Sequence, residues 1–158
     1  EPAELFIAAA REFAAATGQR TVVLTGRKSV APSGDPNLVL LPRIEPDQVQ
    51  YLLAEALLVV SNGGSTMIHV LAHGRPLVAI PLAGDQDRRI RRAVRLQIAD
   101  TAERTPRAIA EAAARLLREP ERRAAMCRHT AELGIANGVS EAVAALLALA
   151  RQRQIRVP

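Results

Sequence analysis

The chain has 158 residues, which suits one domain, and 49% of them are hydrophobic, enough to bury a core. It has one Tyr, two Phe and no Trp, so it lacks the stacking side chains of single-stranded nucleic-acid binders, and we expect no nucleic-acid partner. The formal net charge of +5 suits anionic partners or an anionic membrane surface, and a single cysteine, Cys127, excludes an internal disulfide.

Short apolar runs alternate with helical patterns along the chain. The predicted elements are a helix over 4–16, a strand over 21–25, a loop over 27–36, a strand over 37–41, a helix over 46–56, a strand over 57–61, a helix over 65–73, a strand over 77–81, a helix from 84 to about 97, a short edge strand at 98–99, and helices over 106–118, 120–133 and 140–152. Thr105 and Ser140 are the expected caps of the helices that follow them. The alternation predicts an α/β fold with a doubly wound, Rossmann-like parallel sheet and helices on both faces.

A glycine turn lies between the strand over 57–61 and the helix that follows. Gly63 and Gly64 come first, and Ser65 and Thr66 open the helix. Backbone N–H groups at such a turn and the dipole of the helix favour a bound phosphate. The same residues also suit an ordinary tight turn with a hydroxyl N-cap. We favour the phosphate site, which predicts a phosphorylated ligand.

Three other loops follow predicted strands. They are the turn after Gly26, the loop after Leu41 and the Gly84-Asp85-Gln86 turn after Pro81. Ligands of open parallel sheets bind outside the carboxyl ends of the strands, so we expect all four loops to converge on one edge.

The order of these motifs points to a known family. A strand, Asn62-Gly63-Gly64-Ser65-Thr66, a helix, Gly74-x-Pro76, an apolar strand and Gly84-Asp85-Gln86 follow one another. This order resembles the C-terminal, donor-binding domain of GT-B fold glycosyltransferases. It is similar to UDP-sugar transferases, including the bacterial family that adds GlcNAc to the lipid-linked peptidoglycan precursor. The resemblance implies that residues 1–158 form a single nucleotide-sugar-binding domain, the C-terminal half of a longer protein.

The implied function is transfer of a sugar from a nucleoside-diphosphate donor, with UDP as the expected nucleotide, to an acceptor. Gly63, Gly64, Ser65 and Thr66 would bind the diphosphate, Asp85 and Gln86 the hydroxyls of the transferred sugar, and the loop over 43–45 would lie against the uracil. The general base of this family usually lies on the N-terminal half. No catalytic residue is therefore assigned, and the isolated domain is expected to be inactive.

Two positions differ from the family pattern. Asn62 stands where a His is common, and His69 stands where a Glu usually holds the ribose hydroxyls. A histidine can bond a hydroxyl but cannot offer the paired oxygens of a carboxylate. A non-catalytic nucleotide- or phosphate-binding module therefore stays an alternative, as does a sugar-nucleotide epimerase or hydrolase of the same architecture.

The family's C-terminal half also begins with a strand and a glycine-rich turn before its first helix, whereas this chain begins in that helix. The missing strand is normally central in the sheet, so we expect an unpaired gap there. We also expect residues before Glu1. They would belong to an N-terminal domain, for which a partner subunit is the alternative.

The other residues of the helix over 65–73 are expected to have structural roles. Met67, Val70 and Leu71 form the predicted core stripe of their helix. His69 and His73 have a zinc-compatible spacing but no third ligand, so we expect no metal, and no cofactor is predicted.

A cationic run on the helix that begins at Gly84 is predicted to be a solvated face. It consists of Arg88, Arg89, Arg91, Arg92 and Arg95. Contact with an anionic lipid-linked acceptor, a membrane or the other domain is the alternative for this run. No apolar run reaches the ~20 residues of a membrane span, and we expect a cytoplasmic location, with a peripheral position at the inner face of the membrane as a further option.

Overall fold

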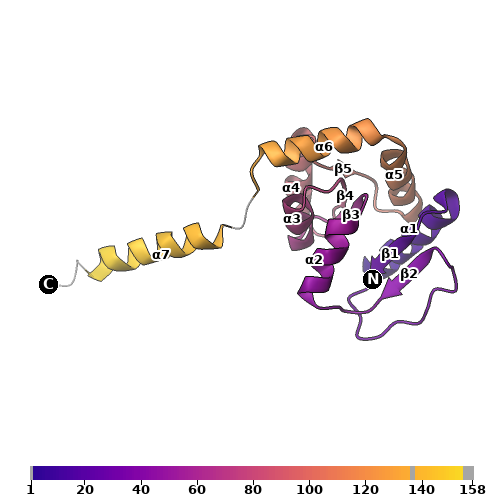
Figure 1. Ribbon diagram of the computed structural model, residues 1–158, viewed down its shortest axis with the longest axis horizontal. Helices are drawn as coiled ribbons and strands as arrows, with labels where there is room; N and C mark the ends of the chain where they lie inside the picture. Colours follow the sequence, from indigo (N-terminus) through magenta and orange to yellow (C-terminus); the bar gives the residue numbers. More distant parts are fainter. Residues whose placement is uncertain (1, 136–137, 155–158) are drawn as a thin grey trace.

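The computed structural model describes residues 2–135 and 138–154, and it has the predicted α/β character (Figure 1). The helices are α1 (Pro2–Thr17), α2 (Pro46–Glu55), α3 (Ser65–Ala72), α4 (Gly84–Arg95), α5 (Pro106–Arg118), α6 (Pro120–Glu132) and α7 (Val139–Gln154). The strands are β1 (Thr21–Leu24), β2 (Leu38–Leu41), β3 (Val59–Asn62), β4 (Leu77–Ile80) and β5 (Asp100–Thr101). Most bounds lie within two residues of those predicted from the sequence.

The strands form two small parallel sheets. β1 pairs with β2, with Thr21 opposite Leu38. The second sheet has the order β3-β4-β5, with Val59 opposite Leu77. Within the described residues no ladder joins β1 to β3, so a break lies between the two sheets, as expected from the sequence.

The larger core lies on both faces of β4, whose four residues are all buried. Val78 and Ile80 pack in a cluster with residues of α1, α5 and α6. Leu77 and Ala79 pack on the other face with residues of α3 and α4. Helices therefore cover both faces of the second sheet, which is why its central strand is continuously apolar.

Helix α1 contributes to the cores of both sheets. Ala9 belongs to the cluster around β4, whereas Ile7 and Ala10 pack with Val23 and Leu38 of the first sheet. The other face of β1 lacks such cover: Val22 and Leu24 are each 41% exposed. The segment from β1 to β2 contains no helix that could pack on this face.

Two predicted details are wrong. The last strand is Asp100–Thr101 rather than 98–99. Gln97 adopts a positive φ of 56° and Ile98 N–H donates to the Ala93 carbonyl at 3.0 Å, so Ile98 closes the end of α4 before pairing can begin. Ser140 is inside α7, because the Gly138 carbonyl already accepts the first helical bond, from Ala142 N–H at 2.9 Å. Thr105 caps α5 as predicted, accepting from Ala108 N–H at 3.2 Å.

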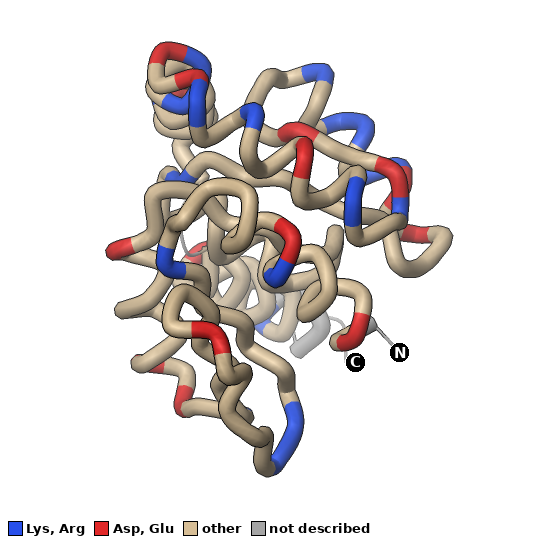
Figure 2. Tube along the Cα trace, turned by 90° about the vertical axis from the view of Figure 1, so that its right-hand side faces the viewer, with Lys and Arg blue, Asp and Glu red and all other residues tan. Residues whose placement is uncertain are grey.

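Helix α7 extends away from the packed body (Figure 1). Its larger apolar side chains are exposed: Val139, Val143, Leu146, Leu147 and Leu149. No helix in the described part of the chain is both long enough and apolar enough to cross a membrane. Acidic and basic positions are interspersed over the body in the view of Figure 2, rather than gathered in one region.

Candidate functional site at the carboxyl edge of β3 and β4

Two loops leave the second sheet at the same edge. β3 and β4 are parallel neighbours, and their last residues, Asn62 and Ile80, are opposite each other. The glycine turn leads from β3 into α3, and residues 81–83 lead from β4 into α4. Two helix N-termini therefore begin from adjacent strand ends, the place where doubly wound sheets bind ligands.

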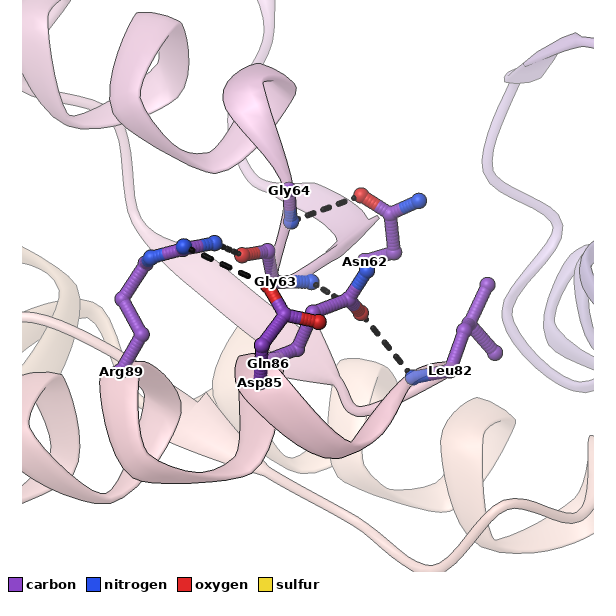
Figure 3. Close-up of polar contacts among 7 residues, drawn as sticks. All are labelled: Asn62, Gly63, Gly64, Leu82, Asp85, Gln86 and Arg89. Atoms are coloured by element: carbon purple, nitrogen blue, oxygen red, sulfur yellow. Dashed lines mark hydrogen bonds and ion pairs between the residues drawn. The ribbon is translucent and has the colours of Figure 1, made fainter.

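The side chain of Gln86 joins these two loops (Figure 3). Its Oε1 accepts hydrogen bonds from Gly63 N–H at 3.2 Å and from Leu82 N–H at 3.0 Å. One amide oxygen therefore satisfies a donor from each loop. Its carbonyl oxygen thus fixes the two loops together (Figure 3), and the sugar contact expected for Gln86 stays a prediction.

Gly63 is required at this position by packing alone. A Cβ on Gly63 would lie 2.8 Å from Ile90 Cδ1 and 2.9 Å from Gln86 Cβ, closer than such atoms approach. Gly64 has a separate contact, since its N–H donates to Asn62 Oδ1 at 3.0 Å. Gly63 thus lets the turn after β3 approach α4 closely, a reason for its presence that does not depend on a ligand.

Arg89 belongs to the site, although the sequence predicts it only as part of a solvated cationic face. Its guanidinium donates to the Gly63 carbonyl, and Nη2 lies 3.6 Å from Asp85 Oδ2 (Figure 3). The signal that could have identified it is its spacing, three residues after Gln86 and therefore on the same side of α4. Figure 3 shows Arg89 and Gln86 holding the glycine turn from the same helix.

Ser65 and Thr66 are exposed in the first turn of α3. The N-cap of this helix is Gly64, and no side-chain bond caps it, so the predicted alternative of a hydroxyl cap is wrong. The first N–H groups of a helix have no partner within it. The exposed start of α3 therefore presents hydroxyl and N–H donors together.

The rest of α3 follows the predicted pattern. Met67, Val70 and Leu71 are buried, and His69 is exposed one turn beyond the glycine turn. His73 contacts Gln50 Oε1 through its Nε2 atom. Within the described residues, no three His, Cys, Asp or Glu side chains come together in a way that could hold a metal.

The loops after β1 and β2 form a second pair. Arg43 N–H donates to the Arg27 carbonyl at 2.7 Å, and the Thr25 hydroxyl donates to the Leu41 carbonyl at 2.9 Å. Arg27 also pairs with Glu4 of α1. These hydrogen bonds join the loop after β1 to the loop after β2, and those of Gln86 join the loop after β3 to the loop after β4. The two pairs of loops lie on the two sides of the break between β1 and β3.

Helix N-termini and charged side chains together set the electrostatics of the edge. Asp85 and Asp87 in the first turn of α4 are paired with Arg89 and Arg91, which limits their repulsion of an anion. The first turn of α3 has no acidic residue. The chemistry offered here is anion binding by N–H and hydroxyl donors, favoured by the helix dipoles.

Comparison with protein-family models gives no match for this chain, and comparison with curated protein sequences finds no significant relative.

Proposed function

We propose that this chain is the donor-binding half of a glycosyltransferase and binds a nucleoside-diphosphate sugar at the carboxyl edge of β3 and β4. The observation that carries the proposal is the bridge made by Gln86, which holds the glycine turn against the start of α4. The bridge holds the starts of two helices at one edge, and the dipoles of both helices favour an anion such as a diphosphate there.

In the proposed complex, the diphosphate lies at the first turn of α3. Ser65, Thr66 and the N–H groups of that turn donate to its oxygens. As the glycosyl bond breaks, the departing diphosphate gains negative charge, and donors already aimed at it stabilise the transition state. UDP is the expected nucleotide because of the resemblance of residues 61–86 to the UDP-sugar transferases.

A non-catalytic nucleotide- or phosphate-binding module is the second candidate. In both candidates the Gly63 and Gly64 N–H groups are already bonded, to Gln86 and Asn62. A ligand must then rely on the start of α3, or displace these side chains. His69 in place of a carboxylate adds weight to this candidate, because it removes a paired acceptor for ribose hydroxyls.

Calorimetric titration of the chain with UDP-GlcNAc, UDP, ADP and GDP tests donor binding. The informative variant is Ser65→Ala combined with Thr66→Val. Because neither hydroxyl caps α3, this variant should keep its Tm, yet bind UDP about tenfold or more weakly after losing bonds to a charged group. Ser29→Ala, in an exposed loop, is the matched control and should bind as the unmodified chain does.

Two results would count against the proposal. Absence of heat with all four nucleotides would reject donor binding by this chain. Binding that is unaffected by the double variant would move the ligand away from the start of α3. A third result would favour the non-catalytic module. In it, the chain binds UDP-GlcNAc, but no GlcNAc is transferred when the chain is combined with an acceptor-binding domain.

A further inference from the structure

Two side chains accept the N–H groups of the glycine turn, and they are held differently. Gln86 comes from α4, and its Oε1 accepts from Gly63 N–H at 3.2 Å and from Leu82 N–H at 3.0 Å. Asn62 is the last residue of β3, and among the described residues its Oδ1 makes one hydrogen bond, with Gly64 N–H at 3.0 Å. A ligand can therefore displace Asn62 by breaking one bond, whereas displacing Gln86 would also release the loop after β4.

The amide oxygen of Asn62 lies at the start of α3. Figure 3 shows Oδ1 directed at the Gly64 N–H and the amide nitrogen directed away from the turn. Gly64 is the N-cap of α3, and a Cβ on this glycine would lie 2.9 Å from Oδ1. The oxygen therefore takes a place where the N–H and the helix dipole would both stabilise an oxygen of an anion.

We propose that Asn62 is an internal competitor of the diphosphate, because its Oδ1 holds the Gly64 N–H until a phosphate oxygen takes its place. This inference rests on the proposed donor site and states how the affinity of that site is set. A charged oxygen accepts a stronger hydrogen bond than an amide oxygen does, so a phosphate can displace Asn62. The amide oxygen is tethered two residues before Gly64 and competes at a high effective concentration.

The competition lowers the affinity of the turn and sharpens its selectivity. A ligand that needs the Gly64 N–H binds only the chains in which this group is free, and its apparent affinity falls by that fraction. The net stability of one neutral hydrogen bond corresponds to a factor of about 3 to 10. A neutral hydroxyl oxygen accepts no better than the amide oxygen of Asn62, so the turn favours ligands whose oxygens are charged.

Amide hydrogen exchange in the nucleotide-free chain tests the contact itself. Asn62→Ala removes the acceptor and should speed exchange at Gly64 by about threefold to tenfold. Exchange at Gly63 should change little, because Gln86 still holds that N–H. Asn37→Ala, which removes the same side chain just before β2, is the matched control and should leave both amides unchanged.

Calorimetric titration with UDP and with inorganic pyrophosphate tests the competition. Asn62→Ala should bind both probes about threefold to tenfold more tightly than the unmodified chain, since no internal bond has to be broken. Asn62→Asp keeps an acceptor oxygen and adds a charge that repels the probe. It should therefore bind about tenfold or more weakly than Asn62→Ala does.

A double variant locates the displaced oxygen. Gly64→Ala added to Asn62→Ala puts a Cβ beside the place that Oδ1 occupies in the unmodified chain. If a phosphate oxygen takes that place, the added Cβ should cancel the gain in affinity of the single variant.

Three results would count against the inference. Equal or weaker binding of both probes by Asn62→Ala would overturn the competition and leave the donor site in place. Full retention of the gain in the double variant would also overturn it, because the ligand would then lie elsewhere. Absence of binding by every variant would reject the donor site itself, and the competition with it, even where exchange at Gly64 responds to Asn62→Ala.

Discussion

The two sheets of this protein show how differently similar strands can be used. β4 (LVAI) has a partner on both sides and is buried throughout, whereas β1 (TVVL) has one partner and leaves two of its four side chains exposed. The loops after β3 and β4 are joined by Gln86, and those after β1 and β2 by their own backbone and Thr25. The number of strands paired with it, rather than its own composition, decides how much a strand contributes to the core.

The largest expected effect tests this contrast directly. Ile80→Ala removes a fully buried side chain from β4 and should lower the free energy of unfolding by about 2–5 kcal/mol. Leu24→Ala removes a side chain of the same size from β1, where it is 41% exposed, and should cost roughly 1 kcal/mol, because a large part of its apolar area is already in water. Urea denaturation measures both. Equal losses would mean that the exposed face of β1 is covered in solution.

The second prediction concerns the close approach of β3 to α4. Gly63→Ala places a Cβ 2.8 Å from Ile90 Cδ1, so the helix or the strand must shift, at a cost of about 1–3 kcal/mol. Gly84→Ala is the matched control at the start of α4, where nothing lies within 4 Å of an added Cβ. Thermal unfolding should show a lower Tm for the first variant only. A normal Tm for Gly63→Ala would show that the turn is looser than described.

The third effect, no larger than the second, tests the accepting oxygen of the Gln86 amide. Gln86→Met leaves the Gly63 and Leu82 N–H groups without their acceptor and should cost about 1–3 kcal/mol. Gln86→Glu retains an acceptor oxygen and should keep most of that stability. Chemical denaturation of both variants is the measurement. If Glu is as damaging as Met, the bridge depends on something other than the accepting oxygen.

The elements were predictable because local signals agree with one another. Pro46 and Pro106 lie at helix starts and Gly74 follows the end of α3, as the sequence indicates. The two errors arose at positions where a backbone bond decides the outcome. Ile98 is apolar enough for a strand, yet its N–H closes α4, and Ser140 is a good cap that Gly138 displaces.

The site was predictable only in part. Strand order and motif spacing placed Gly63, Gly64 and the start of α4 at one edge, as found. The bridging role of Gln86 and the contact of Arg89 depend on the angle between α4 and β3, which no local pattern encodes. The motif therefore predicts a ligand contact for Gln86, and the run of arginines predicts a solvated face for Arg89, which donates to the Gly63 carbonyl.

Donor binding at the carboxyl edge of β3 and β4 is tested most directly by mapping amide chemical shifts during titration with UDP-GlcNAc. The proposed complex predicts the largest shifts at Ser65, Thr66 and Met67, smaller ones around Gly84–Gln86, and little change in α5 and α6. Shifts centred elsewhere, or none at saturating nucleotide, would contradict it.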